Sequence, residues 1–502
     1  MIARKSALII VTHMLSGILG YVALFFVTRY MDPSAYGIMA FSYSFVAIFS
    51  VVGNLGFNHA HVKKISEGRD IGTCIGTFFV TKIGLACAMV VFTLLSIFVW
   101  TVFFGRGFET SVHEKAVYIM LVYWAVRVVA HSMVVTFQAK KEIAKFQLPV
   151  FFEASVRSLF IAFVAVSGWG VIPLVLCYIA GDVAYIVSSA VFFRGNNIKH
   201  PSFDFFKEYA RFAFPLSIVV ASMVIMNNID RVFIQLFWSA KDVGYYFAAY
   251  SMVSFINLFT ASIGLLLFPT FSYMNSKNDI LGIKKVTLVS ERYLSMIIFP
   301  MVIAVIVFAR PISNVLLSGW GGTIPILCVL PLFVLFDALE RPYQSNFLGM
   351  NRPHIARNRI LIMFVANISL NIVLIPRDIQ SIGLPLFGLG ATGAAIATSV
   401  SYGIGLVYSR FSAWKITGVK GSSSVFVHGC IAVLVGLFFV VSQFFFSFQR
   451  WYLLLGAFLL FISLYFFLLY LFRAFTKNDL HIFLDSLNVK KMFVYIKDEI
   501  FN

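Results

Sequence analysis

The chain has few charged residues and no long polar segment. Only 12% of its 502 residues are charged, whereas 60% are hydrophobic. Soluble domains carry about twice that share of charge. The polar connections between the apolar stretches are also too short to fold alone. The composition therefore excludes a soluble catalytic domain and indicates a polytopic membrane protein.

Catalytic and metal-binding motifs are missing as well. There is no Walker A sequence, so ATP is not the direct energy source, and no HExxH or Cys/His cluster suggests a metal. The five cysteines lack CxxC spacing, which favours small apolar packing residues. No loop resembles the large outer domain of membrane glycosyltransferases. We therefore expect a protein that is not an enzyme and that holds no cofactor.

What the chain has in abundance is long apolar stretches. Most are long enough to cross about 30 Å of hydrocarbon at about 1.5 Å per residue. They predict an all-α membrane protein with 14 transmembrane helices, the first too long for a cleavable signal. The predicted spans are 6–28, 38–57, 78–104, 114–137, 148–167, 171–193, 212–237, 243–268, 293–317, 324–348, 359–375, 389–411, 425–446 and 451–472.

The connections alternate between strongly basic and nearly uncharged. With the N-terminus in the cytoplasm, the inner segments hold roughly 27 Lys and Arg and the outer loops roughly 7. This alternation predicts a multi-pass protein of the cell (inner or plasma) membrane with both termini cytoplasmic. The net charge of +18 is spread over short loops that face anionic lipid, so nucleic acid is not an expected partner.

Two connections in the sequence resemble each other. RYMDPSAYGIMAFSYS (Arg29–Ser44) follows the first span, and FWSAKDVGYYFAAYS (Phe237–Ser251) follows the seventh. They align on Gly37 and Gly244, and this alignment pairs like residues further along. The aligned pairs are Tyr43 with Tyr250 and Ser44 with Ser251.

A weaker similarity relates the ends of the fourth and tenth spans. There FQAKKEIAKF (Phe137–Phe146) aligns with FLGMNRPHIA (Phe347–Ala356). Six helices separate the members of each pair, so two six-helix lobes would share one orientation, a design that suits alternating access. Chance similarity between apolar helices is the alternative. The predicted divisions are lobes 1–211 and 212–411, two C-terminal helices in 412–473 and a cytoplasmic tail 474–502, which we expect to form an amphipathic interfacial helix.

Five segments resemble polysaccharide-export proteins, in order along the chain. They are Thr28–Phe45 (TRYMDPSAYGIMAFSYSF), Asp230–Met252 (DRVFIQLFWSAKDVGYYFAAYSM), Leu267–Met274 (LFPTFSYM), Tyr343–Pro376 (YQSNFLGMNRPHIARNRILIMFVANISLNIVLIP) and Gly388–Ser401 (GLGATGAAIATSVS). The sequence is similar to Wzx-type O-antigen flippases, in the superfamily of multidrug MATE exporters and the peptidoglycan-precursor flippase. One departure is the inserted segment Ile379–Phe387, which should lengthen an outer loop.

The resemblance implies a MATE-like fold and a flippase. Its cargo would be an isoprenoid-pyrophosphate-linked oligosaccharide, moved from the inner to the outer leaflet for surface polysaccharide, O-antigen or glycan assembly. Implied partners are this lipid, the bilayer and other polysaccharide-assembly membrane proteins. A multidrug or small-cation exporter of the same fold, a membrane polysaccharide polymerase or ligase, and a non-transporting scaffold remain alternatives.

Charged residues inside the predicted helices are the candidate substrate-binding positions. A charge at the bilayer centre costs at least about 2.5–3.5 kcal/mol on insertion scales, and a pyrophosphate needs a cationic groove. The planar guanidinium can bind two phosphate oxygens. The candidates are Arg127, Arg157, Arg231 and Lys82, together with Arg29, which the resemblance to peptidoglycan-precursor flippases implies.

Local ion pairing is the competing interpretation of these charges. Glu153 precedes Arg157 by four residues and Asp337 precedes Arg341 by four, a spacing that brings side chains together on a helix. Lys82 lies near the inner end of its span, where its ammonium can snorkel to the interface. These pairings would give the charges a structural role.

The ion-coupling candidates are Asp182, Asp230 and Asp337. A carboxylate near the midplane can change its charge with its occupant, so a Na⁺ or H⁺ gradient could drive transport. Arg127 has no carboxylate within one turn, which favours a cavity position for this residue. Asp230 would either form an outer gate or ion site, or pair with a neighbouring helix.

Overall fold

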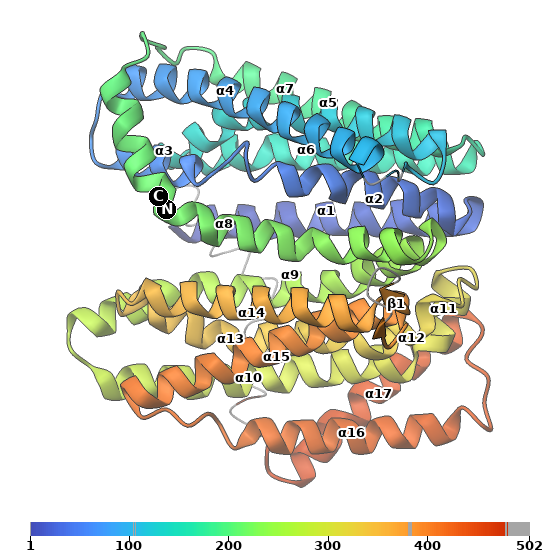
Figure 1. Ribbon diagram of the computed structural model, residues 1–502. Helices are drawn as coiled ribbons and strands as arrows, with labels where there is room; N and C mark the ends of the chain where they lie inside the picture. The colour runs from blue at the N-terminus through green and yellow to red at the C-terminus, as the bar shows by residue number, and fades with distance from the viewer. Residues whose placement is uncertain (1, 104, 106, 380–383, 477–478, 480–502) are drawn as a thin grey trace. The chain divides into compact units, whose positions relative to one another are not determined.

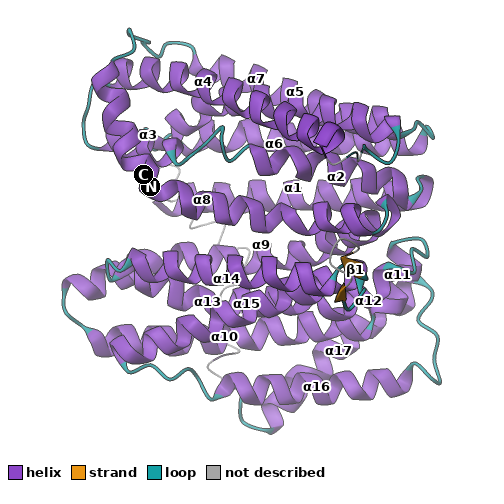
Figure 2. Ribbon diagram, in the orientation of Figure 1, coloured by secondary structure: helices purple, strands orange, loops and turns teal. Residues whose placement is uncertain are grey.

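The computed structural model describes residues 2–103, 105, 107–379, 384–476 and 479 (Figure 1). Figure 2 shows helices throughout these residues, joined by short loops. A two-residue strand pair, β1 (Asp378–Ile379) and β2 (Leu384–Pro385), is antiparallel. This hairpin begins one residue before the segment Ile379–Phe387, which the sequence analysis identified as an insertion.

The helical segments follow the predicted order. They are α1 (Ile2–Tyr30), α2 (Pro33–Phe49), α3 (Phe57–Ser66), α4 (Ile71–Phe98), the π-helix η1 (Val99–Phe103), α5 (Ser111–Ala139), α6 (Ile143–Val166), α7 (Val171–Phe193), α8 (Phe203–Phe237), α9 (Ala240–Ser276), α10 (Ile280–Val307), α11 (Ala309–Leu316), α12 (Thr323–Val329), α13 (Pro331–Gly349), α14 (Pro353–Leu374), α15 (Gly390–Thr417), α16 (Ser424–Ser442) and α17 (Trp451–Leu471).

The described helices confirm a multi-pass membrane protein. Twelve segments are long and apolar enough to cross a membrane, with α12 and α13 forming one of them. The shorter apolar helix α2 and the 37-residue helix α9 account for the other two predicted spans. The short helix α3 was not predicted, and it lies in the connection after the predicted span 38–57. The predicted span 293–317 joined two helices, since α11 begins directly after α10.

The chain folds into two compact units. The first, here the N-terminal unit, comprises 11–248 and 364–394; the second, here the C-terminal unit, comprises 1–10, 249–363 and 395–502. The predicted division at 211, 411 and 473 stays a prediction. Of the predicted tail 474–502, only 474–476 and 479 are described, so the expected interfacial helix lies outside the described residues.

Polar residues fix where several helices begin. The Asp32 carboxylate accepts a hydrogen bond from the Ser34 amide at 2.7 Å, and Pro33 occupies the first helical position of α2. The Asp70 carboxylate accepts one from the Thr73 amide at 2.8 Å at the start of α4. Such caps satisfy amides that have no partner inside the helix.

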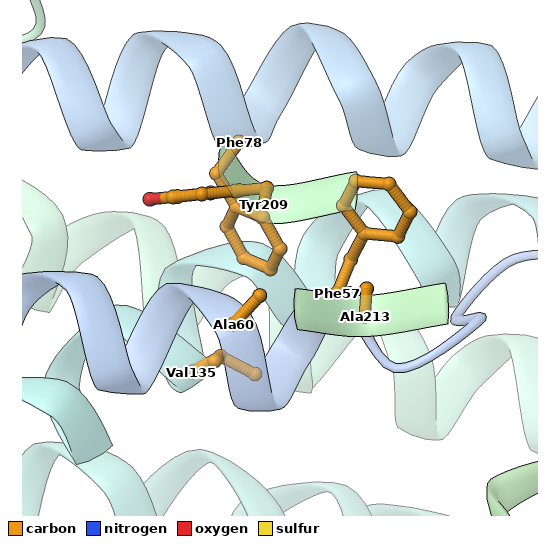
Figure 3. Close-up of a cluster of buried hydrophobic side chains, with 6 residues drawn as sticks. All are labelled: Phe57, Ala60, Phe78, Val135, Tyr209 and Ala213. Atoms are coloured by element: carbon orange, nitrogen blue, oxygen red, sulfur yellow. The ribbon is translucent and has the colours of Figure 1, made fainter. Parts of the chain in front are cut away.

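A buried cluster holds α3 against α4, α5 and α8 in the N-terminal unit (Figure 3). His61 of α3 stacks on the Phe78 ring with centroids 4.0 Å apart. Its two ring nitrogens lie 2.9 Å from the Tyr209 hydroxyl and 2.9 Å from the Thr136 hydroxyl. This short helix is therefore anchored by packing and by satisfied polar contacts together. The cluster consists of Phe57, Ala60, Phe78, Val135, Tyr209 and Ala213.

The turn after α5 and the turn after α13 have the same backbone geometry. Lys141 and Asn351, which the repeat alignment pairs, both adopt left-handed φ angles, 61° and 55°. In each turn the amide of the next residue donates to the carbonyl five residues earlier, at 2.9 Å and 2.8 Å. The same geometry recurs after α9 at Asn278 and after α17 at Arg473. It is a common way to end a helix in the described residues, and the repeat stays a prediction.

The paired glycines of the repeat meet each other. A Cβ added to Gly37 of α2 would overlap the carbonyl oxygen of Ala240, and one added to Gly244 of α9 would overlap that of Pro33. The starts of two repeat-related helices therefore approach at backbone distance. Glycine is required at both positions because any side chain would separate the helices.

We expect Gly37→Ala to lower the unfolding temperature of the detergent-solubilised protein. The added methyl must displace the backbone of α9, and such overpacking costs about 1–3 kcal/mol. Gly84→Ala is the matched control, because a Cβ there meets no atom within 4 Å. Equal unfolding temperatures for the two variants in a thermal melt would contradict the close helix contact.

Candidate functional site

Three predicted arginines lie around one tyrosine in the N-terminal unit. Arg127 comes from α5, Arg157 from α6 and Arg231 from α8. The Tyr43 hydroxyl of α2 lies within electrostatic range of all three guanidinium groups. Residues from four helices are thus brought into one cationic cluster, which we call the arginine cluster.

Aromatic rings form the frame of the arginine cluster. The Tyr43 ring centroid lies 6.2 Å from Tyr123, 5.3 Å from Trp124 and 5.4 Å from Tyr178. The Trp124 indole N–H donates to the Tyr43 carbonyl oxygen at 3.3 Å. These large rigid side chains fix the distance between α2, α5 and α7.

Arg127 is paired with a carboxylate from another helix. Its Nη1 donates to Asp182 Oδ1 of α7 at 2.8 Å, and its guanidinium lies 3.6 Å from the Tyr185 ring centroid. Asp182 is 2% exposed, and the Arg127 side chain is 17% exposed. The two residues are 55 positions apart in the sequence. The sequence analysis considered only carboxylates within one turn of Arg127, so it did not predict this pair.

Arg157 forms the ion pair that its spacing predicted. Its Nε donates to Glu153 Oε1 at 2.7 Å, and its guanidinium lies 5.0 Å from the Tyr178 ring centroid. Gly181 permits the close approach of α7, since a Cβ there would lie 2.9 Å from Arg157 Cβ and 3.0 Å from the Glu153 carbonyl oxygen. The side chain of Arg157 nevertheless stays 29% exposed.

Arg231 is held by amide groups and an aromatic ring. It donates to the Asn227 carbonyl oxygen and, at 3.3 Å, to Asn228 Oδ1. Its guanidinium lies 5.1 Å from the Phe247 ring centroid. All three arginines of the cluster are therefore placed by a polar partner and an aromatic face together.

Asp230 contacts neighbouring helices, as one of the two interpretations predicted. It accepts a hydrogen bond from the Tyr246 hydroxyl at 2.5 Å and from Asn371 Nδ2 of α14 at 2.7 Å. Asn371 Nδ2 also lies 3.2 Å from Asn367 Oδ1. This group of oxygen-rich side chains, all buried, forms a polar site that we call the Asp230 site.

The other two predicted cations lie elsewhere in this unit. Lys82 is 1% exposed, and its Nζ donates to the Gly53 carbonyl oxygen at 2.8 Å in the turn after α2. The prediction that Lys82 snorkels to the interface is wrong, because the ammonium has a buried carbonyl partner. Arg29 lies in the last turn of α1, with its guanidinium 4.2 Å from the Phe25 ring centroid.

Asp337 belongs to the C-terminal unit and is paired there. Arg341 donates to Asp337 Oδ2 at 2.6 Å, which confirms the predicted pairing along α13. Glu340, on the same helix, accepts from the Ser409 hydroxyl at 3.0 Å and forms an ion pair with Arg359 of α14 at 3.3 Å. Sequence spacing did not predict this second pair, since Arg359 comes from the next helix.

The C-terminal unit also has aromatic packing like that around Tyr43. Tyr250, the repeat partner of Tyr43, stacks on Phe333 with centroids 5.8 Å apart and planes 5° from parallel. Phe333 in turn lies 5.4 Å from Tyr402. The repeated Tyr in the two connections was the only signal of these clusters in the sequence.

Comparison with known proteins identifies the family. Residues 2–275 match the family model described as polysaccharide biosynthesis protein. The chain belongs to this family. The match covers more than half of the 502 residues and confirms the resemblance found in the sequence.

Individual relatives agree with this placement. The chain is 23% identical over 417 residues to the probable low-salt glycan biosynthesis flippase Agl15 of Haloferax volcanii, covering 81% of this chain and 82% of that protein. Two solved structures have the same fold. They are the lipid II flippase MurJ (TM-score 0.71, 16% identity, 92% and 98% covered) and an inward-facing MATE transporter (TM-score 0.66, 15% identity, 81% and 96% covered).

We expect Asp182→Ala to destabilise the protein more than the double change Arg127→Leu with Asp182→Leu. Removing one member of a buried pair leaves an uncompensated charge and costs up to about 3–5 kcal/mol, reduced here by the exposure of Arg127. Thermal unfolding of the three proteins in detergent measures the difference. A double variant less stable than Asp182→Ala would show that the pair is not what holds α5 to α7.

Proposed function

We propose that this protein flips an isoprenoid-pyrophosphate-linked oligosaccharide from the inner to the outer leaflet by alternating access. It would serve surface polysaccharide, O-antigen or glycan assembly in the cell membrane, with both termini cytoplasmic. The observation that carries the proposal is the arginine cluster inside a membrane-spanning unit. Family membership and the relative named as a glycan biosynthesis flippase support it. An exporter of cations has no use for such a cluster.

The arginine cluster can bind a pyrophosphate without losing its frame. A guanidinium has five N–H donors, so contact with Asp182 through Nη1 leaves other donors of Arg127 for a phosphate oxygen. Aromatic rings restrict the Arg127 and Arg157 side chains. Less side-chain freedom is then lost when the head group binds.

Charge balance links cargo binding to a change at Asp182. Asp182 neutralises Arg127 before cargo binds, as Glu153 neutralises Arg157. A pyrophosphate that binds the other donors of Arg127 brings negative charge close to the buried Asp182 carboxylate. Proton uptake at Asp182 would relieve this repulsion, so cargo binding and proton binding favour each other.

The Asp230 site is the stronger candidate for a Na⁺ ion. Asp230, Asn367 and Asn371 bring carboxylate and amide oxygens together, the donor type that hard cations prefer. In the part of the chain that the structure describes, the buried Asn371 Oδ1 has no hydrogen-bond partner. A cation would use this oxygen. The site joins α8 with α14, so occupancy by an ion would change how firmly these helices are held together.

We expect Arg127→Ala to slow flipping of a fluorescent isoprenoid-pyrophosphate oligosaccharide in proteoliposomes by about ten- to hundredfold. This is the effect of losing charge-assisted hydrogen bonds worth about 1.5–3 kcal/mol. Arg450→Ala is the matched control, since Arg450 lies in the exposed connection before α17 and contacts Tyr452.

Two outcomes of this assay would count against the proposal. One is a wild-type protein that leaves the lipid in place while a cationic dye crosses under a proton gradient, which would identify an exporter. The other is equal flipping by wild type and Arg127→Ala, which would remove the arginine cluster from the transport path.

We expect Asp230→Asn to abolish the dependence of flipping on an imposed Na⁺ gradient. The amide keeps the hydrogen-bonding shape but cannot compensate a bound cation. The measurement compares flipping rates of wild type and variant with and without the gradient. If wild type responds to a proton gradient alone and the variant responds equally, the ion site is not at Asp230.

A further inference from the structure

A pocket lies at one end of the N-terminal unit, near the end of α4 and the start of α5. Its volume is about 390 Å³, within the range of about 300–1,000 Å³ that is usual for small-molecule sites. We call it the end pocket. Its lining residues come from α2, α4, η1, α5, α8, the connection before α5 and the end of α8. None of the described lining residues is a predicted arginine or aspartate.

Five aromatic rings line the pocket. They are Phe41, Phe45, Trp100, Phe108 and Trp238. Phe108 lies 6.4 Å from Phe41 and 6.2 Å from Phe45, in edge-to-face contact. Trp238 is fixed by a 2.8 Å hydrogen bond from its indole N–H to the Ile375 carbonyl oxygen. Trp100 lies in the π-helix η1, a feature that frequently marks functional sites.

One side of the end pocket is polar. Gln235 Nε2 donates to Glu109 Oε2 at 2.8 Å, and His113 Nε2 lies 3.6 Å from the same oxygen. The other imidazole nitrogen of His113 is 2.8 Å from the Thr110 hydroxyl, which also caps α5. In the described part of the chain, His113 Nε2 and Gln235 Oε1 have no well-formed hydrogen bond, although His113 is 2% exposed.

The chemistry of this wall selects among ligands. The one carboxylate among the described lining residues is Glu109, which repels a phosphate. A purely apolar ligand would leave the polar side without partners. A quaternary ammonium would suit the rings and Glu109, but it can neither donate to nor accept from Gln235 and His113. Hydroxyl groups both donate and accept, and the C–H face of a sugar ring packs on aromatic rings.

We infer that the end pocket binds a neutral sugar ring, with Trp100 and Phe108 against its face and Glu109 and Gln235 bonding its hydroxyl groups. The biological meaning of the site rests on the proposed function, because the oligosaccharide of the cargo supplies such rings. In the proposed orientation the pocket lies at the outer end of the unit. It would hold the glycan there after the pyrophosphate has left the arginine cluster.

Saturation-transfer NMR with the purified full-length protein in detergent tests the inference. It measures the binding of neutral methyl hexosides. We expect wild type to bind, and Trp100→Ala and Phe108→Ala each to weaken binding by about tenfold or more, as is usual for buried aromatic anchors. Phe108 lies outside the helices, so its variant remains informative if Trp100→Ala does not fold. Trp169→Ala, at an exposed position after α6, is the matched control.

Tetraphenylphosphonium serves as the competing probe in the same measurement. Glu109→Gln removes the charge and should weaken hexoside binding only a few-fold. Hexosides that do not bind to wild type, or that bind equally to the two aromatic variants, would overturn the inference. A wild type that binds tetraphenylphosphonium but no hexoside would also overturn it. If Glu109→Gln then abolished this binding, the pocket would be assigned to cations. Arg127→Ala should still bind hexosides, so failure of the proposed flippase function is seen separately.

Discussion

The compensation of buried charge is the constraint on which the rest of this structure depends. A chain with 60% hydrophobic residues still places arginines and carboxylates within its helices, where an unpaired charge is costly. Arg127, for instance, meets Asp182 from another helix and the face of Tyr185. Since Arg127 lies on α5 and both Asp182 and Tyr185 lie on α7, these contacts also help to make α5 and α7 neighbours.

Aromatic rings hold the arginine side chains in place and leave their N–H donors available for a ligand. A guanidinium that lies on a ring is restrained without using its N–H donors, and Tyr43 with its neighbours holds α2, α5 and α7 at fixed distances. Comparable packing occurs around Tyr250 in the C-terminal unit, at the position that the predicted repeat pairs with Tyr43. The charges differ between paired positions, since the same alignment places Asp337 opposite Arg127.

Apolar runs predicted the membrane-spanning helices, and helix spacing predicted the ion pairs along one helix. Five segments that resemble polysaccharide-export proteins predicted the family. Glu153 with Arg157 and Asp337 with Arg341 followed from a separation of four residues. Contacts between helices were beyond this reasoning. Asp230 and Asn371 are 141 residues apart, and nothing local to either residue points to the other. The prediction for Lys82 failed for a related reason. Its partner is the backbone carbonyl of Gly53 in a turn, and no residue type in the sequence indicates such a partner.

A balanced cluster is better suited to transport than an uncompensated one. Three arginines without carboxylates would bind a pyrophosphate tightly and release it slowly, because the low-dielectric interior strengthens every ion pair. Asp182 and Glu153 neutralise Arg127 and Arg157 in the structure. In the proposed function, the attraction of the cargo to the arginines would be offset by its repulsion from these carboxylates. Affinity would then be low enough for release, while selection for an anionic head group is retained.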